Sequence, residues 1–347
     1  MADAVWDDES IRQRAEHLLK TLGLAPIQSF TRLLGGANNR VFRLETTSRR
    51  LLLKAYFRHP LDLRDRLAAE AALLELAWKH GVRSVPEPVA FDHVHALGLQ
   101  EFVPGRKLRR DEIDETRVEQ AAGFLVDVNR LRDTREAEQL PLASEACFSV
   151  DEHIAKVEQR VQRIEGATLA AEDGDLAVGT IQSRLRSLWD RVRGEVERQA
   201  SRVGIARQPS LPSEHRCVSP SDFGFHNALA MPSGELRFID FEYAGWDDPA
   251  KTICDFFCQP AIPVPLDLFD RFMGRLSPVL ADPTRTLARV RLLWPMIQVK
   301  WCCILLNGWL PEAVARRRFA GAPAGADATS LGQRLESIDK TLFTAIG

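Results

Sequence analysis

The stretch SPSDFGFHNALAMPSGELRFIDFE, residues 219–242, decides the fold of this 347-residue chain. It contains two short apolar or alternating runs, ALAM at 228–231 and ELRFID at 235–240. The residues between them, 232–234, are Pro, Ser and Gly, which favour turns. The pattern therefore predicts a β-hairpin with short strands.

Three polar residues flank the predicted hairpin: Asp222, Asn227 and Asp240. An antiparallel hairpin returns the chain to its start, so we expect these side chains to converge at one edge. Phosphoryl transfer needs magnesium on the phosphates and a carboxylate that orients, or takes the proton from, the attacking hydroxyl. Carboxylate and amide oxygens are suitable magnesium ligands. The arrangement predicts Asp222 as the base and Asn227 and Asp240 as metal ligands.

Residues 222–224 spell Asp-Phe-Gly, which in protein kinases marks the metal-binding Asp rather than the base. That interpretation requires a base Asp and its Asn upstream of Asp222. Residues 198–221 contain neither Asp nor Asn, so the match is interpreted as a coincidence. The metal-binding Asp is instead expected at Asp240.

On these residues the chain resembles the aminoglycoside phosphotransferase and choline kinase-like family, a branch of the protein-kinase-like fold. In that family a His-Gly-Asp-containing loop leads to an Asn five residues after the Asp, and an Ile-Asp segment follows. This chain departs from the pattern at Pro220 and Ser221, which stand where His and Gly are usual. The family's His mainly braces the loop, so the departure bears on loop geometry and rate.

The resemblance implies a small-molecule kinase that uses ATP (or GTP) and Mg²⁺ to phosphorylate a hydroxyl of a small metabolite. It also implies an α+β, bilobal fold, with a small β-rich N-terminal lobe and a larger helical C-terminal lobe. A catalytically silent nucleotide-binding pseudokinase stays open as an alternative, because Pro220 stands in the catalytic loop. The retention of Lys54 together with the three hairpin residues favours the enzyme.

The order of the predicted elements agrees with two lobes. Period-2 and period-3.6 patterns predict strands, one helix and further strands, at 29–35, 40–46, 50–57, 61–81, 86–94 and 96–105. From Asp111 onward the chain is mainly helical, with long helices expected near 178–203 and 285–309. We expect a nucleotide-binding lobe at 1–103 and a catalytic and substrate-binding lobe at 104–347.

The small lobe carries the residues expected to hold phosphates. Gly35, Gly36 and Asn38 lie in a turn between two strands, where glycines let backbone amides approach phosphates closely. Lys54 interrupts the apolar run 51–55, where a lysine either reaches solvent or holds its charge between other groups. The resemblance implies that this lysine binds the α- and β-phosphates and pairs with a helical Glu.

The expected partner of Lys54 is Glu70, because Leu74 follows it in the family's Glu-x-x-x-Leu spacing. Glu75 and Asp65 are the alternatives. The segment joining the lobes is expected to meet the adenine edge through its backbone, and comprises Gln100, Glu101, Phe102 and Val103.

Other polar residues near the hairpin are interpreted as structural. Asp248 and Asp255 are expected to cap helices or brace the loop, and His226 to form hydrogen bonds within it. Glu242 stays open as a ligand of a second metal ion.

Composition excludes several other classes of protein. Hydrophobic residues make up 45% and charged residues 27% of the chain, and the formal net charge is −2, which gives no electrostatic case for binding nucleic acid or a membrane. The longest apolar stretch, 301–306, is far shorter than the roughly 20 residues that span a bilayer. The acidic N-terminus lacks an apolar signal segment, so we expect a cytoplasmic protein with reduced cysteines. No pattern assigns an oligomeric state.

The C-terminal region gives an expectation about the acceptor. Residues 291–347 carry seven Lys or Arg against four Asp or Glu, with three consecutive arginines at 316–318. Arginine clusters favour phosphate or carboxylate groups and repel polycations. We therefore expect a neutral or anionic acceptor, such as a sugar or a phosphorylated metabolite. An aminoglycoside acceptor and a merely solvated basic helix stay open as alternatives.

Overall fold

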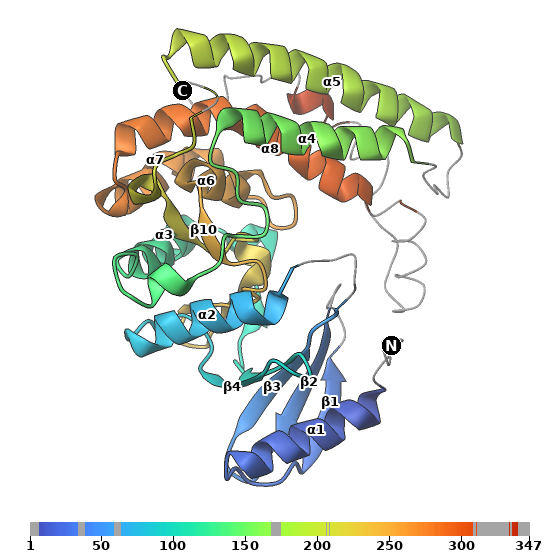
Figure 1. Ribbon diagram of the computed structural model, residues 1–347, viewed down its shortest axis with the longest axis vertical. Coiled ribbons are helices and arrows are strands. Elements are labelled where there is room, and N and C mark those ends of the chain that lie inside the picture. Colours follow the sequence, from blue (N-terminus) through green and yellow to red (C-terminus); the bar gives the residue numbers. More distant parts are fainter. Residues whose placement is uncertain are drawn as a thin grey trace.

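The computed structural model describes residues 7–33, 39–58, 64–167, 175–205, 207, 209–307, 310, 333 and 335–338. Its small lobe is built on an antiparallel sheet with the strand order β1-β2-β3-β5-β4. These strands are β1 (Ser29–Leu33), β2 (Arg40–Glu45), β3 (Arg50–Ala55), β4 (Pro88–Asp92) and β5 (Leu97–Glu101). Figure 1 shows this sheet at one end of the molecule and the helical lobe at the other. The expected bilobal α+β fold is confirmed.

Helix α1 (Asp8–Thr21) covers one face of the sheet (Figure 1). Its buried residues Ile11, Ala15 and Leu19 recur at helical spacing and pack in one cluster with alternate residues of β2 and β3, including Phe42 and Leu53. The Asp7 side chain caps the helix by accepting a hydrogen bond from the Ser10 amide at 2.8 Å. The sequence analysis did not predict this helix.

Helix α2 (Arg66–Lys79) lies between the sheet and the large lobe (Figure 1). It begins five residues later than the sequence pattern suggested, because Asp65 is its cap and accepts a hydrogen bond from the Ala68 amide at 3.0 Å. Glu70 is buried on the helix, whereas Glu75 is exposed. Of these two glutamates, Glu70 is the one that meets the sheet, where it accepts hydrogen bonds from Lys54.

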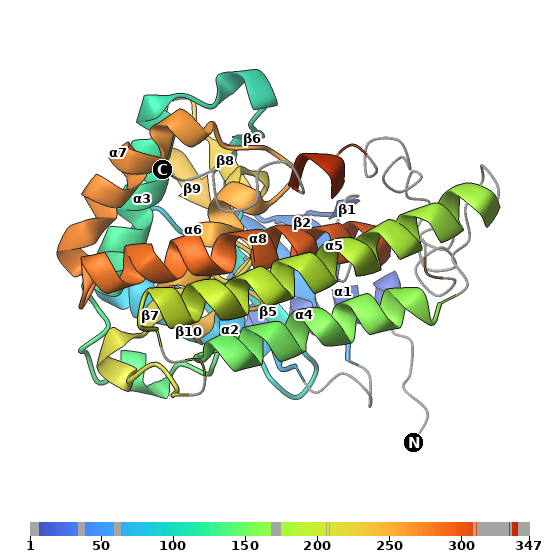
Figure 2. The ribbon, with the colours of Figure 1, turned by 90° about the horizontal axis from the view of Figure 1, so that it is seen from above.

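The large lobe is mainly helical. Its helices are α3 (Glu115–Asn129), α4 (Val150–Glu165), α5 (Asp175–Arg202), α6 (Pro249–Cys258), α7 (Phe269–Leu276) and α8 (Pro283–Asn307). Seen from above, α4, α5 and α8 run side by side (Figure 2). Among the described residues, no helix combines the length and apolar character needed to cross a membrane.

Two small sheets support the region between the lobes. The expected hairpin is present as β8 (Ala228–Ala230) and β9 (Leu236–Phe238), and β6 (Arg106–Lys107) pairs with β8 as a third strand. A second sheet pairs β7 (Cys217–Ser219) with β10 (Gly245–Asp247). Because β7 leads into the hairpin segment and β10 follows it, the second sheet fixes both ends of that segment.

Gly245 in β10 packs directly against the backbone of a neighbouring loop. A Cβ atom on Gly245 would lie 2.6 Å from the Ala143 nitrogen, so backbone atoms would have to move. We expect Gly245→Ala to lower the free energy of unfolding by about 3 kcal/mol. In contrast, Gly123→Ala in α3 meets nothing within 4 Å and should stabilise the protein by roughly 0.5 to 1 kcal/mol. Urea unfolding of both variants measures the difference, and equal stabilities would contradict the packing described here.

Candidate active site

The ammonium group of Lys54 is bonded to carboxylates of both lobes. Lys54 on β3 donates from Nζ to both carboxylate oxygens of Glu70, at 2.8 and 2.9 Å, and to Asp240 Oδ1 at 2.8 Å. Lys54 and Glu70 are buried in the small lobe, while Asp240 follows β9 in the large lobe. The ion pairs therefore hold the hairpin end against the sheet.

The Tyr56 hydroxyl completes this group by donating to Glu70 Oε2 at 2.5 Å. Burial, and then the charge of Glu70, raises the pKa of Tyr56 well above its ordinary value, so the phenol keeps its proton. Burial also raises the pKa of Glu70, although the Lys54 charge opposes the shift. The phenol is a neutral donor that the sequence analysis did not identify.

Burial and charge have opposing effects on the pKa values of Lys54 and Asp240, which form the ion pair between the lobes. Burial acts to lower the pKa of Lys54, but the carboxylates of Asp240 and Glu70 outweigh it, so the pKa lies above its usual value. Burial acts to raise the pKa of Asp240, but the Lys54 charge and hydrogen bond hold it below the usual value. Both groups are therefore charged near neutral pH.

The Asp222 carboxylate is held on both oxygens. His226 Nε2 lies 3.1 Å from Oδ1, and Asn227 Nδ2 donates to Oδ2 at 3.3 Å and to the Asp222 carbonyl at 3.0 Å. Because the amide nitrogen of Asn227 is used in this way, its oxygen is left for another partner. The Ile239 amide donates to the Asn227 carbonyl at 2.9 Å, which brings the two ends of the hairpin together.

The Asp-Phe-Gly residues of this loop serve packing. Phe223 is buried, with its ring centroid 5.0 Å from that of Phe256 and 5.8 Å from that of Phe124. A Cβ atom on Gly224 would lie 2.7 Å from Nδ1 of the His226 ring. Gly224 therefore lets the imidazole lie close to the backbone, in reach of Asp222.

Backbone strain is concentrated on either side of this arrangement. Ser221 and Asp240 have positive φ values of 66° and 70°, which side-chain-bearing residues rarely adopt. The Asp222 amide bonds to the Pro220 carbonyl at 2.9 Å, so Ser221 is the centre of a tight three-residue turn. Such outliers persist where surrounding contacts enforce them.

Two hydroxyl groups hold the strained turn. Ser219 Oγ accepts from the Ser221 amide at 3.0 Å and from Thr252 Oγ1 at 2.9 Å. Thr252 is buried in α6, so the helix supports the loop through Ser219. This pair occupies the bracing role that the resemblance assigned to a His, at a position that here is Pro220.

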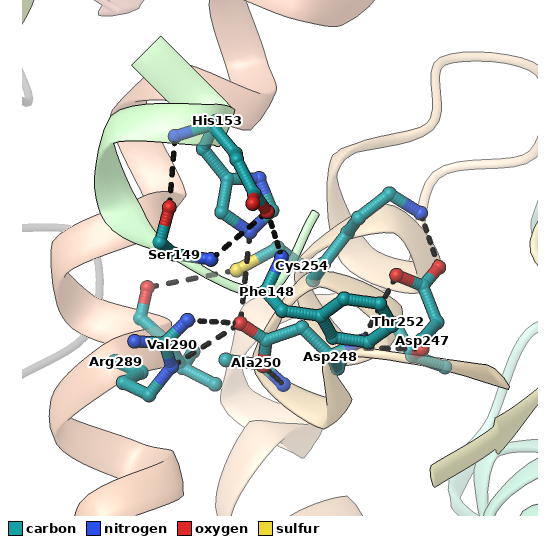
Figure 3. A network of polar contacts seen from close by, with 12 residues as sticks. Phe148, Ser149, His153, Asp247, Asp248, Ala250, Thr252, Cys254, Arg289 and Val290 are labelled. Carbon is teal, nitrogen blue, oxygen red and sulfur yellow. Dashed lines mark hydrogen bonds and ion pairs between the residues drawn. The ribbon is translucent and has the colours of Figure 1, made fainter. Parts of the chain in front are cut away.

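A buried charge network lies around the start of α6 (Figure 3). Asp248 caps α6 by accepting from the Ala250 amide at 2.8 Å and is ion-paired with Arg289 of α8. Lys251 bonds to Asp247 at 2.6 Å and lies 3.2 Å from Asp255, which also binds Lys300. Three carboxylates thus face three cations in the interior. Asp248 caps a helix, as expected, whereas Asp255 lies within α6 and pairs with two lysines.

Glu242 is engaged with the small lobe. Its carboxylate accepts a hydrogen bond from Asn39 Nδ2 and lies 3.8 Å from Arg66 Nε. Asn39 Oδ1 in turn accepts from the Phe57 amide at 3.3 Å. The residue adjacent to the predicted phosphate loop therefore touches the segment after Asp240, a contact that the sequence analysis missed.

The segment predicted to meet the adenine edge connects the two lobes. Gln100 and Val103 are buried, and Phe102 lies under Arg43, with the guanidinium carbon 5.7 Å from the ring centroid. Glu101 Oε2 accepts from Arg237 Nη2 at 2.6 Å, which ties the segment to β9. The other predicted nucleotide-binding residues, Gly35, Gly36 and Asn38, lie outside the described residues. So do the arginines at 316–318.

Lys107 on β6 was not predicted as a site residue. Its ammonium donates to the His226 carbonyl at 2.6 Å. Partial burial of this ammonium lowers the pKa of Lys107, against the attraction of Asp240. No local sequence signal distinguishes it from the neighbouring basic residues at 106–110, because its position depends on strand pairing with the hairpin.

A bilobal fold with a lysine, its glutamate and an Asp-Asn-Asp hairpin defines a kinase-like phosphotransferase. The sequence model of the phosphotransferase enzyme family matches residues 29–259, well over half of the chain. The chain therefore belongs to the phosphotransferase enzyme family, and the resemblance and the enzyme class expected from the hairpin are confirmed. No curated protein sequence matches the chain.

Solved structures of similar fold include three kinases. The spectinomycin phosphotransferase APH(9)-Ia, in complex with ADP and spectinomycin, is 12% identical with a TM-score of 0.59, over 96% of this chain and 95% of that one. The choline kinase LicA from Streptococcus pneumoniae is 17% identical with a TM-score of 0.58, over 96% and 98%. The macrolide 2'-phosphotransferase MphH from Brachybacterium faecium is 15% identical with a TM-score of 0.57, over 89% and 96%. The protein-kinase-like fold is thus confirmed.

The strained turn gives a test by substitution. Because Ser221 has a φ of 66°, glycine should suit this position better than alanine, and Ser221→Gly should be more stable than Ser221→Ala by about 1 kcal/mol. At Ser183, an exposed position within α5, the order should reverse, with alanine better by about 1 kcal/mol. Thermal and urea unfolding of the four variants measure both differences. Greater stability of the alanine variant at Ser221 would contradict the turn.

The buried network gives a second test. Arg289→Met leaves the buried Asp248 carboxylate without its main partner and should cost about 3 to 5 kcal/mol of stability. The control is Arg271→Met, because the exposed Arg271 lies 2.7 Å from Glu115 and should cost at most about 1 kcal/mol.

The pH dependence of the Arg289 effect has a definite sign. Burial acts to raise the pKa of Asp248, but Arg289 holds it below its usual value, so the stabilisation is present above the unfolded carboxyl pKa and is lost on acidification. The gap between wild type and Arg289→Met should narrow below about pH 4. A gap that is constant from pH 7 to pH 3 would show that packing, rather than charge, dominates.

Proposed function

We propose that this phosphotransferase moves the γ-phosphoryl group of ATP (or GTP) to a hydroxyl group of a small molecule, with Mg²⁺. The observation that carries the proposal is the 2.8 Å contact between Lys54 Nζ and Asp240 Oδ1. It places a cation suited to nucleotide phosphates beside a carboxylate suited to magnesium.

The proposal assigns the nucleotide to the junction of the lobes. Lys54, positioned by Glu70, would bind its phosphates, and the backbone of residues 100–103 would meet its base. Gly35, Gly36 and Asn38, which lie outside the described residues, are proposed to approach the phosphates. The ADP bound to the spectinomycin phosphotransferase supports a nucleotide in a fold of this kind.

The donor groups fit magnesium. Asp240 offers a half-buried carboxylate, and Asn227 offers the amide oxygen that is left when its nitrogen bonds to Asp222. Magnesium commonly uses one or two protein oxygens together with water and substrate phosphates. The described residues hold no cluster of three or more His, Cys, Asp or Glu that could bind a metal ion. Bound there, magnesium would offset phosphate charge during transfer.

Asp222 is the proposed base. The acceptor oxygen would form a bond to the γ-phosphorus as the bond to the bridging oxygen breaks, and that electron pair would leave with the nucleoside diphosphate. The acceptor proton would pass to Asp222. His226 and Asn227 hold the two carboxylate oxygens, so the base is oriented before the acceptor arrives.

The acceptor belongs to the proposal only as a class. The similar structures include enzymes named for spectinomycin, choline and a macrolide, and none of these names supports the expected sugar. A catalytically silent nucleotide-binding protein is the competing function, since Pro220 and Ser221 depart from the family loop. The hydrogen bonds of Ser219 favour the enzyme, because they hold that loop in place.

Nucleotide consumption decides between these functions. The purified chain is incubated with ATP or GTP, with and without Mg²⁺, against a panel of alcohols that includes sugars, amino alcohols, aminoglycosides and phosphorylated metabolites. We expect one acceptor class to stimulate release of nucleoside diphosphate, and only with Mg²⁺. Nucleotide binding without turnover on any member would favour the silent protein.

Substitutions separate the base from the metal ligand. Asp222→Ala should lower the rate of turnover by at least about 100-fold. Its affinity for Mg·nucleotide should stay within about twofold of wild type. Asp240→Ala should weaken Mg·nucleotide binding by about tenfold or more, because a charged ligand is lost. Calorimetry and initial rates measure both, with Asp133→Ala, an exposed aspartate, as the control. Full activity of Asp222→Ala would refute the assigned base.

A further inference from the structure

The start of the large lobe carries four basic residues: Arg106, Lys107, Arg109 and Arg110. The three arginines form hydrogen bonds with nearby carboxylates or carbonyls. Arg106 forms two hydrogen bonds to Glu112, at 2.6 and 2.8 Å. Arg109 bonds to Asp111 at 3.1 Å, and Arg110 reaches two backbone carbonyls, those of residues 260 and 261. These contacts fix three guanidinium groups on the surface of the lobe.

The fourth residue, Lys107, is exposed as well, but its partners differ. Among the described parts of the chain it has no carboxylate within ion-pairing distance, and its Nζ donates to the His226 carbonyl at 2.6 Å. A carbonyl is a neutral acceptor and uses one of the three N–H donors of an ammonium. Two donors and the full positive charge are therefore left for another partner.

Strand pairing places this ammonium at the reacting end of the site. Lys107 on β6 lies opposite Leu229 on β8, two residues after Asn227. His226, whose carbonyl it contacts, bonds through its ring to Asp222. The charges of Asp240 and Lys54 both act on Lys107. The Lys107 ammonium is therefore linked through His226 to the proposed base, and its strand pairs with the strand that begins directly after the proposed metal ligand Asn227.

Resting on the proposed function, we propose that Lys107 is a further catalytic residue, whose ammonium binds the γ-phosphoryl group of the nucleotide and stays on it during transfer. The transferred group spreads negative charge over three oxygens, and a cation held beside those oxygens stabilises that charge. Lys107 neither gains nor loses a proton. The acceptor proton goes to Asp222, and the leaving electron pair goes to the nucleoside diphosphate.

This role predicts that Lys107 contributes to the binding of nucleotides with a γ-phosphoryl group but not to the binding of nucleotides without one. The comparison can be made without knowing the acceptor. Calorimetry compares Mg·ADP with the Mg²⁺ complex of the β,γ-imido analogue of ATP, which carries a γ-phosphoryl group that is not transferred. Lys107→Gln removes the charge and should weaken binding of the ATP analogue by about tenfold, with Mg·ADP binding changed less than about twofold. Lys107→Arg, which keeps the positive charge, should retain most of the wild-type affinity for the ATP analogue.

Arg106→Gln is the matched control, because the residue is adjacent and its charge is taken by Glu112. It should bind both nucleotides like wild type. If Lys107→Gln weakens both nucleotides equally, or neither, Lys107 only supports the loop through His226 and the inference is wrong, although the proposed function stands. If the wild-type chain binds neither nucleotide, the proposed function fails and this inference fails with it.

Discussion

The contact on which the site depends is the ammonium of Lys54 between two carboxylates from different lobes. Glu70 comes from α2 and Asp240 from the segment after β9, so neither is near Lys54 in the sequence. A buried cation is unstable without partners, and a buried carboxylate such as that of Glu70 is costly without a cation. The three groups therefore constrain one another, and they set the distance between the sheet and the hairpin. Tyr56 adds a neutral donor, which fixes Glu70 without adding charge.

The large lobe contains a second charged network, which supports the loop that carries Asp222. Asp247, Lys251 and Asp255 lie in β10 and α6, and Arg289 and Lys300 come from α8. Buried ion pairs of this kind add little net stability, but the loss of one partner is costly. Their effect is to fix the position of α6, and Thr252 of that helix holds Ser219. Ser219 in turn holds the strained turn before Asp222. The network thus supports the position of Asp222 through α6 and Ser219.

The hairpin and the lysine were predictable because each depends on local sequence. Turn residues between two short runs define β8 and β9, and a lysine in an apolar strand needs a carboxylate. Glu70 was predicted from the family's Glu-x-x-x-Leu spacing. Helix α1 was missed because its buried face comprises only three residues of a largely polar segment. Lys107 and Asn39 were missed for another reason: their neighbours come from segments more than 100 residues away, and nothing local marks them.

The family motif predicts which residues occur in the loop around Asp222, but it does not predict which contacts hold that loop. With Pro220 and Ser221 in place of His and Gly, the loop lacks the His that braces it in the family. The turn is instead held by the hydroxyl groups of Ser219 and Thr252, and His226, four residues after Asp222, bonds to its carboxylate. Lys107 then links the strand after the lobe junction to the backbone of His226. Contacts that are absent from the motif thus position Asp222 from two sides, one from α6 and one from β6.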